Sequence, residues 1–485
     1  MKKLIKNDAF AIVLDFETSG TDFLNDQIHS VYASVVNEDG IELNSFQAQC
    51  RSESFRLSNP EALLVNGISN ETLFNGDHPL DVHIQLKDFI QKYPEIPIIA
   101  FNAAFDFKFG FQGLFQACDP DPYFWKKGRK VICAMHLVRS QYMNDPDALI
   151  IPKISGGLSF RQEDIATANG IYFPRHEAKG DVQTLRAIMQ KVKLSSPDLI
   201  KKAKFFGNRA NTESFLHRKK FVVVPTGWKT DFSVRCIVPL AFDANQKNFL
   251  GFDIGMLDPR ELPLDEEFPA FSATYVASGI AKRKIDSRFP FVKLPLNQSI
   301  IFEGEEMWRA SEPSADITYE ILCERAAAAR SNGALLELTQ TAMHFDQNRF
   351  DDDESEQLES RLFEGFTSAV EKNFLYSMFS LPLEVRFDYL IENKEFANNR
   401  YHKLARRYLL DKFPELCPLK ELNRFKEWRL NRLTSGPAKH TTFMKAKKQL
   451  NNLHKKYPDE QSRLEEIKDY LDLKLDMVSL DYSDL

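Results

Sequence analysis

An apolar segment that ends in two acidic residues, AIVLDFET at residues 11–18, most constrains the fold of this chain. Its continuous apolar stretch is typical of a buried strand in an open α/β sheet, and such sheets bind ligands at the carboxyl ends of their strands. Because side chains alternate along a strand, Asp15 and Glu17 are predicted to point to the same face. Neighbouring carboxylates repel each other unless cations neutralise them. We therefore expect a strand that presents an acidic ligand set.

Two later motifs add two acids and a histidine. Asp106 follows the apolar run IPIIAF, and His176 and Asp181 lie in RHEAKGDVQTL. Apolar residues then recur at helical spacing, which predicts an amphipathic helix that opens near Asp181. Each motif alone has an ordinary explanation: a solvated strand end, an acid favoured by the helix dipole, or a surface histidine.

The combination of these motifs favours metal-dependent hydrolysis. Carboxylate oxygens at this density suit Mg²⁺ or Mn²⁺, and two such ions can promote phosphodiester cleavage. A nearby histidine suits the base that takes a proton from water, since the ordinary histidine pKa of about 6.5 leaves the ring neutral at working pH. We expect metal-binding and catalytic roles for Asp15, Glu17, Asp106 and Asp181, and a catalytic role for His176.

This set of motifs resembles the DEDDh group of DnaQ-like 3′→5′ exonucleases. The order and spacing of ETSGTDFLNDQIHSVYASVVNEDG, NPEALLVNGIS and LSFRQEDIATANGIYFPRHEAKGDV are similar to bacterial exodeoxyribonuclease I. The DPYFW segment at residues 121–125 and the long C-terminal extension indicate that family in particular. Later segments, SEQLESRLFEGF and ARRYLLDKFPEL among them, extend the resemblance over most of the chain.

The resemblance implies an α/β fold in three parts. They are a ribonuclease H-like exonuclease domain at 1–195, an SH3-like β-rich domain at 200–348 and a C-terminal helical DNA-binding domain at 355–485. Local patterns agree, because strand-like and helix-like segments alternate at first. Short apolar runs separated by Gly, Pro, Asn and Asp follow, and a mainly helical part begins after the acidic run 351–356.

The implied activity is stepwise release of 5′-mononucleotides from the 3′ end of single-stranded DNA, in repair or recombination. By resemblance, Asp15 would bridge two Mg²⁺ ions, Glu17 and Asp181 would complete one site, and Asp106 would help to hold the other.

The resemblance also suggests substrate contacts. Thr18 would contact the terminal nucleotide through its backbone, and Leu64 and Val65 would wedge against the last base. Ordinary core packing is the alternative for Leu64 and Val65.

Two other functions remain open from the residues. A DEDDh exoribonuclease would share the catalytic set, since contacts to the 2′-hydroxyl distinguish RNA from DNA. A non-catalytic single-strand-binding adaptor would keep the fold without the chemistry. The long extension beyond residue 195 favours the DNA enzyme, and the presence of all five active-site residues argues against the adaptor.

Basic residues are concentrated in one segment although the net charge is −6. Residues 400–456 contain sixteen Lys and Arg against four Asp and Glu, with interleaved aromatic residues. Such a strip suits a single-strand groove, in which charge follows phosphates and rings stack on bases. A solvated helical face over an apolar core is the alternative. The resemblance further suggests that the acidic tail of single-stranded-DNA-binding protein docks on basic residues.

The remaining features predict a monomer in the cytoplasm. The six cysteines lie far apart without a C-x-x-C pair, which is typical of free thiols in a reducing compartment. The first residues lack the apolar region of a signal peptide. No segment approaches the roughly 20 apolar residues of a membrane helix.

Overall fold

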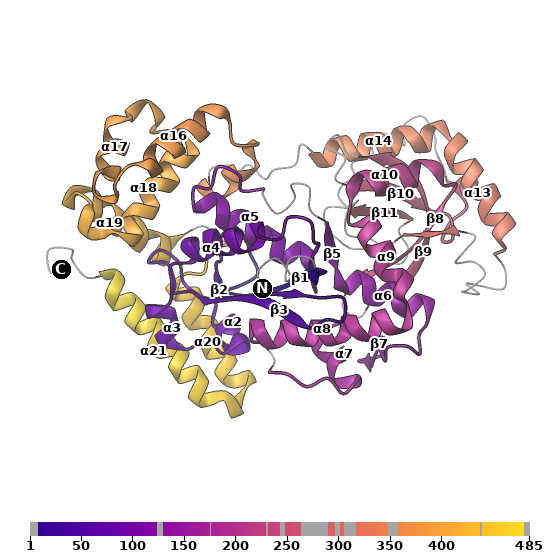
Figure 1. Ribbon diagram of the computed structural model, residues 1–485, viewed down its shortest axis with the longest axis horizontal. Coiled ribbons are helices and arrows are strands. Elements are labelled where there is room, and N and C mark those ends of the chain that lie inside the picture. Colours follow the sequence, from indigo (N-terminus) through magenta and orange to yellow (C-terminus); the bar gives the residue numbers. More distant parts are fainter. Residues whose placement is uncertain are drawn as a thin grey trace.

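The computed structural model describes residues 8–123, 130–174, 176–228, 231–242, 248–262, 290–295, 301–304, 317–347, 357–436 and 439–479. Part of the DPYFW motif (residues 124–125) and the acidic run 351–356 lie outside these ranges. Figure 1 shows a central α/β unit, with an antiparallel β unit on its right and the C-terminal helices on its left. The predicted α/β fold with a β-rich and a helical part is confirmed.

A five-stranded sheet forms the centre of the α/β unit, in the order β3-β2-β1-β4-β5. Its strands are β1 (Ala11–Thr18), β2 (Ile28–Val36), β3 (Glu42–Gln49), β4 (Ile98–Ala100) and β5 (Val131–Cys133). The pairs among β1, β2 and β3 are antiparallel, whereas β4 and β5 continue from β1 in parallel. β1 therefore has a neighbour on each side, which explains why its sequence is so apolar.

Helices cover both faces of this sheet and extend beyond it. They are α2 (Pro60–Asn66), α3 (Asn70–Asn75), α4 (Pro79–Gln91), α5 (Ala103–Gln116), α6 (Ala134–Asn144), α7 (Gln162–Ala168), α8 (Ala178–Ser195), α9 (Pro197–Phe206) and α10 (Arg209–Arg218), with a hairpin of β6 (Lys153–Ile154) and β7 (Gly157–Leu158). α8 ends at Ser195, where the sequence predicts that the exonuclease domain ends.

Alternate residues of β1 pack on opposite faces of the sheet. Ala11 and Val13 belong to a core with residues of α6, α8 and α9, whereas Ile12 and Leu14 pack with residues of α4 and α5. The same alternation directs the next odd-numbered side chains of β1 towards the α8 side.

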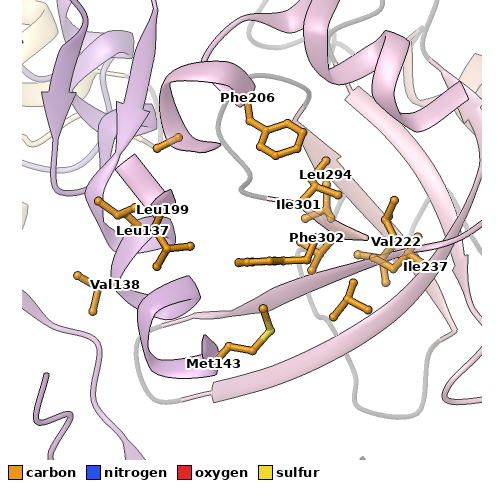
Figure 2. Close-up of a cluster of buried hydrophobic side chains, with 14 of the residues drawn as sticks. Leu137, Val138, Met143, Leu199, Phe206, Val222, Ile237, Leu294, Ile301 and Phe302 are labelled. Atoms are coloured by element: carbon orange, nitrogen blue, oxygen red, sulfur yellow. The ribbon is translucent and has the colours of Figure 1, made fainter. Parts of the chain in front are cut away.

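The β unit is a second five-stranded sheet, in the order β11-β10-β9-β8-β12. Its strands are β8 (Val222–Trp228), β9 (Asp231–Phe242), β10 (Asn248–Asp253), β11 (Phe291–Pro295) and β12 (Phe302–Glu303), and the adjoining helices are α13 (Tyr319–Ser331), α14 (Gly333–Gln347) and the 3₁₀ helix η2 (Pro259–Glu261). Neighbouring strands pair antiparallel throughout. Figure 2 shows Leu137 and Leu199 of α6 and α9 facing Phe302 of β12, so this unit shares a core with the α/β unit.

The C-terminal part is entirely helical in the described residues. It comprises α16 (Ala369–Ser380), α17 (Arg386–Glu392), α18 (Arg400–Lys412), α19 (Leu419–Ser435), α20 (Phe443–Lys456), α21 (Gln461–Ser479) and the 3₁₀ helices η3 (Leu358–Glu364), η4 (Leu383–Val385), η5 (Lys394–Phe396), η6 (Pro414–Leu416) and η7 (Pro458–Glu460). Leu375 and Leu404 lie in the same core as Ile12 and Leu14. The helices are therefore packed into the α/β unit and are not a detachable module.

A buried polar network also joins these helices to the α/β unit. The Asp411 carboxylate of α18 accepts a hydrogen bond from the Ser54 N–H at 2.9 Å and lies 3.1 Å from His78 Nε2. These contacts hold the pKa of Asp411 below its ordinary value despite burial. On α21, the Lys474 ammonium donates to the Glu53 carbonyl at 2.8 Å, and the Tyr470 hydroxyl lies 3.0 Å from Ser52 Oγ. Polar contacts thus fix the orientation of helices that apolar packing holds in place.

All six cysteines are free, as predicted. Four are buried (Cys50, Cys118, Cys133, Cys236) and two are half-buried (Cys323, Cys417). Among the described residues, no helix is both long and apolar enough to cross a membrane.

Replacement of one leucine on α21 tests whether this helix belongs to a shared core. Leu471 is fully buried beside Leu63 of α2, whereas Leu473 on the same helix is 50% exposed. Leu471→Ala should lower the free energy of unfolding by about 2–5 kcal/mol, because it leaves a cavity. Leu473→Ala should change it by less than about 1 kcal/mol. Urea unfolding measures both, and equal effects would contradict the shared core.

Candidate active site

Three carboxylates converge where the end of β1 meets the start of α8. Asp15 and Glu17 stand opposite Tyr32 and Ser30 of β2, and the β1–β2 register shifts directly after Glu17. Asp181 lies in the first turn of α8. Carboxylate oxygens of Asp15, Glu17 and Asp181 all lie within 4.8 Å of one another. The alternation and helix predicted from the sequence therefore bring these three acids together.

Asp106 reaches the same cluster from the other face of the sheet. It lies in the first turn of α5 and is only 4% exposed. The backbone N–H groups of Asp106 itself and of Phe16 donate to its carboxylate. Its charge is the largest contribution from a neighbouring acid to the raised pKa of Asp15. Asp106 therefore belongs to the same acidic cluster as the other three predicted acids, at one end of β1.

His176 lies on the loop before α8, next to Asp181. Its backbone has a positive φ of 57°, an uncommon conformation for a residue other than glycine. Its backbone N–H donates to the Asp181 carboxylate. Gly180 lets this loop cross close to α8, because an added Cβ would overlap the carbonyl oxygen of Pro174. The tight crossing holds the half-buried His176 at the edge of the acidic cluster.

The predicted substrate contacts lie close to β1 but differ in exposure. The Thr18 carbonyl accepts a hydrogen bond from the Asn66 amide at 3.2 Å, which ties α2 to the end of β1. Val65 is 50% exposed and lines an open cavity of about 770 Å³ together with Asn66 and His176. Leu64 is half-buried and packs against the α20–α21 core, which agrees with core packing, and its contact with the last base stays a prediction.

Two residues that position α2 are not evident from the sequence. Asn66 both binds the Thr18 carbonyl and lines the cavity. Arg463 of α21 donates to the Leu63 carbonyl at 3.1 Å and also to the Ile68 carbonyl. Asn66 precedes Gly67, which ends α2 with a positive φ, and this Asn-Gly pair is a weak local signal. Arg463 carries no local signal, since its partners lie about 400 positions away.

Burial raises the pKa values of all four acids, and repulsion by neighbouring acids of the cluster adds to it for Asp15 and Glu17. Burial is the largest cause for Asp15, and the charges of Asp106, Glu17 and Asp181 add to it. Burial also raises the pKa of Glu17 to about 8, of Asp106 to about 7 and of Asp181 to about 6. For Glu17, the Asp181 charge adds to the effect of burial. The cluster therefore resists full ionisation in the absence of cations.

The donor set fits divalent cations because the residues that the structure describes do not neutralise it. No Lys or Arg in the described ranges forms an ion pair with the four acids. A second acidic group, Glu53 with His78 and Asp411, differs in this respect. Arg56 bonds Glu53 at 2.8 Å, and Arg51 lies 3.4 Å from Asp411. Oxygen ligands without a cationic partner suit Mg²⁺ or Mn²⁺, so the β1 cluster is the better candidate for a metal site.

Some cations and rings of the basic segment 400–456 make structural contacts. Arg400 bonds Glu371 at 2.9 Å, and Arg407 bonds Glu359 at 2.8 Å. The aromatic residues Tyr401, Phe425 and Phe443 are at most 6% exposed. Trp428 of the same segment is 38% exposed, so the role of the segment in binding a single strand stays a prediction.

Comparisons with known proteins agree with this geometry. Residues 356–474 match the family model described as the exonuclease I C-terminal domain. Exodeoxyribonuclease I of Haemophilus influenzae is 22% identical over 96% of this chain and 99% of its own length.

Solved structures show the same fold over nearly the whole chain. Exonuclease I from Methylocaldum szegediense superposes with a TM-score of 0.78 at 19% identity, covering 96% of this chain and 99% of its own. E. coli exonuclease I in complex with a dA16 oligonucleotide superposes with a TM-score of 0.80 at 18% identity, with the same coverage of both chains. The resemblance to bacterial exodeoxyribonuclease I that the motifs predict is therefore confirmed, and it extends over nearly the whole chain.

Proposed function

We propose that this protein is a metal-dependent exodeoxyribonuclease that degrades single-stranded DNA from the 3′ end to 5′-mononucleotides. The observation that carries the proposal is the convergence of Asp15, Glu17 and Asp181 within 4.8 Å, with Asp106 beside them and no cationic partner among the described residues. The similar exonuclease I of E. coli has been solved with single-stranded oligonucleotides and with a zinc ion, which supports both the substrate and a divalent cofactor.

Each acid has a proposed place in binding two Mg²⁺ ions, or Mn²⁺. Asp15 would contribute to both ions, Glu17 and Asp181 would complete one site, and Asp106 would help to hold the other. When bound, such ions lower the pKa of the attacking water and stabilise charge at the scissile phosphate. His176 would take a proton from the attacking water, and its backbone N–H bond to Asp181 keeps this residue beside the acids.

The walls of the cavity would hold the last nucleotide. Val65 exposes its side chain to the cavity, and the bond from Asn66 to the Thr18 carbonyl fixes α2 against the catalytic strand. We propose that Val65, with the partly exposed Leu64, packs on the terminal base, while the Thr18 backbone contacts its sugar. Residues 1–195 would then hold the chemistry, and residues 200–348 and 355–485 would guide the strand.

We further propose that the enzyme acts as a monomer in the cytoplasm, in DNA repair or recombination. Free thiols support a reducing compartment. The acidic tail of single-stranded-DNA-binding protein would dock on exposed basic residues of this chain. Pull-down with that tail peptide at moderate salt tests the partnership, and no retention over a scrambled peptide would refute it.

Digestion of end-labelled strands tests the activity itself. Protein with Mg²⁺ should convert 5′-labelled single-stranded DNA into a descending ladder and leave duplex DNA and matched RNA largely intact. A ladder on RNA alone would identify an exoribonuclease instead, and no ladder on any strand would identify a non-catalytic adaptor.

Removal of single carboxylates should abolish hydrolysis without loss of the fold. Asp15→Ala and Asp181→Ala each remove a proposed metal ligand and relieve repulsion, so we expect activity below a few per cent of wild type and no loss of thermal stability. Asp39→Ala, which removes an exposed loop carboxylate, is the matched control. Substantial activity in either site variant would refute the two-metal assignment.

Replacement of His176 should slow the reaction and spare binding. His176→Ala is expected to lower kcat by about 10²–10⁴-fold, the usual effect of a positioned base. The Kd for DNA, measured with a chelator present, should stay within about twofold because His176 acts on the water. His217→Ala on α10, where the side chain is 60% exposed, serves as the control. An unchanged kcat in His176→Ala would mean that another group takes the proton.

The raised pKa values predict how pH affects the metal-free protein. Because the folded-state pKa values of Glu17, Asp106 and Asp181 reach about 8, 7 and 6, the folded chain binds more protons than the unfolded chain from about pH 4 upward. This contribution to stability therefore falls as pH rises towards about 8.

Asp15→Asn should reduce this loss of stability at high pH, because it removes one carboxylate from the cluster. With a chelator at pH 8, the Tm of the variant should exceed that of wild type by about 1 °C for each kcal/mol gained in a chain of 485 residues. The difference should shrink at pH 5 and reverse when Mg²⁺ is added, since wild type then gains binding energy. The exposed control Asp39→Asn should show no such trend in differential scanning fluorimetry. A Tm difference independent of pH would contradict the predicted repulsion.

A further inference from the structure

The open cavity beside the acidic cluster extends across the central sheet to its edge strand. Ser30 of β2 stands opposite Glu17 of β1 and opposite Gln49 of β3, which lies at the edge of the sheet. Directly opposite residues of neighbouring strands point to the same face, so Gln49 shares a face with Glu17. Two strand spacings, roughly 10 Å, separate these two residues. Because Ser30 and Gln49 both line the cavity, a nucleotide with its phosphate at the acids can lay its base over Gln49.

A chain of hydrogen bonds orients the side-chain amide of Gln49. The Ser69 hydroxyl donates to Thr72 Oγ1 at 3.1 Å, and the Thr72 hydroxyl donates to Gln49 Oε1 at 3.3 Å. A hydroxyl has one proton to donate, so a Thr72 oxygen that accepts from Ser69 gives its own proton to the amide oxygen. Gln49 is exposed, and its Nε2 group forms no hydrogen bond with the residues that the structure describes. This group is therefore available to donate to a ligand in the cavity.

A second donor lies on α8. Lys179, in the first turn of this helix, lines the cavity and is exposed. Its ammonium lies 5.9 Å from the centre of the Tyr32 ring on β2, and Tyr32 stands opposite Asp15. Lys179 forms no ion pair within the described ranges, and an ammonium group has three donors and no acceptor. Gln49 and Lys179 thus offer hydrogen-bond donors to one ligand from two elements.

The other polar side chains of the cavity do not add a fixed donor. Asn66 commits both of its amide atoms to backbone groups of the protein. Gln47 is exposed, and its amide can rotate to donate or to accept. Glu71 and Glu177 also line the cavity, and their ionised carboxylates only accept. These two carboxylates are the groups from which the opposite preference for a ligand would arise.

Donors distinguish the nucleobases by their exocyclic groups. Guanine presents O6 and N7 as acceptors and thymine presents O4, whereas adenine and cytosine present an amino group that is itself a donor. A donor that faces an amino group is left without an acceptor, which costs binding free energy. Gln49 and Lys179 therefore suit a base with a carbonyl oxygen at this position.

We propose that Gln49 and Lys179 recognise the base at the 3′ terminus and favour guanine and thymine over adenine and cytosine. The proposal rests on the proposed function, since it takes the terminal nucleotide of a single strand as the occupant of the cavity. Val65 packs on the ring, while Gln49 Nε2 and the Lys179 ammonium donate to its carbonyl oxygen. The two side chains act on the choice of base and not on the attacking water.

Four strands that differ only in the last base test this preference. With 5′-labelled strands at concentrations below KM, the rate of the first cleavage gives kcat/KM for each terminal base. Wild type should cleave strands ending in guanine or thymine about three- to tenfold faster than those ending in adenine or cytosine, the effect of one net hydrogen bond. Gln49→Leu should reduce this ratio to less than about twofold. Equal rates for all four strands in wild type would overturn the proposal.

A change from donor to acceptor gives a sharper result. Gln49→Glu keeps an oxygen for the Thr72 hydroxyl and replaces the Nε2 donor by an acceptor, so the preference should shift towards adenine and cytosine even where the overall rate falls. A preference for adenine and cytosine in wild type that Glu71→Gln abolishes would overturn the proposal and assign base recognition to that carboxylate.

A matched pair of lysines on α8 tests the second donor. Lys179→Met should lower the ratio of rates between the two classes of base, whereas Lys191→Met, at an exposed position outside the cavity, should leave it unchanged. An equal loss of rate on all four strands in Lys179→Met would contradict a contact with the base, because a contact with the phosphate would produce that pattern.

Binding with a chelator present separates this proposal from the proposed function. Trinucleotides that end in guanine should bind wild type about threefold or more tightly than those that end in adenine, and Gln49→Leu should remove the difference. That result would support base recognition even if wild type cleaves no strand. Cleavage of DNA with no dependence of rate or Kd on the last base would overturn base recognition and leave the proposed activity intact.

Discussion

Mutual repulsion among buried carboxylates at the end of β1 is the constraint on which the active site depends. Asp15 and Glu17 share one face of a central strand, and the first turns of α8 and α5 bring Asp181 and Asp106 to the same place. Burial raises all four pKa values, and the charges of neighbouring acids raise those of Asp15 and Glu17 further. A fold that only needed stability would place a cation there, as it does for Glu53 and Asp411. The absence of such a partner among the described residues leaves the free energy of charge neutralisation to divalent ions.

The C-terminal helices help to position α2 beside the acidic cluster. α20 and α21 form a core with α2, and Arg463 binds backbone carbonyls at the end of α2. α2 in turn carries Val65 at the cavity and Asn66 on the Thr18 carbonyl. The surface that would hold the last nucleotide is therefore positioned from the far end of the sequence. Damage to α21 is expected to disturb substrate positioning as well as stability.

Local sequence patterns predict where the acids lie better than they predict the tertiary contacts around them. Alternation along β1 and helical spacing after Asp181 are short-range signals, and the structure brings Asp15, Glu17 and Asp181 together as they indicate. The positive φ of His176 depends on a close crossing with Gly180 that no spacing reveals. The basic segment gives a related case: Glu359 and Glu371, which neutralise Arg407 and Arg400, come from other elements, and the role of the segment in strand binding stays a prediction. Charge counts in a sequence cannot separate buried ion pairs from exposed cations.

Proton release on metal binding tests the central claim most directly. Calorimetric titration of the chelator-treated protein with Mg²⁺ at pH 7, in two buffers of different ionisation enthalpy, measures the protons released. Because Glu17 and Asp106 have pKa values near or above this pH, binding should release protons and should approach two ions per chain. Asp15→Asn should reduce both the affinity and the release. Binding without proton release, or no binding of Mg²⁺ or Mn²⁺ at all, would contradict the account of a repulsive carboxylate cluster neutralised by metal ions.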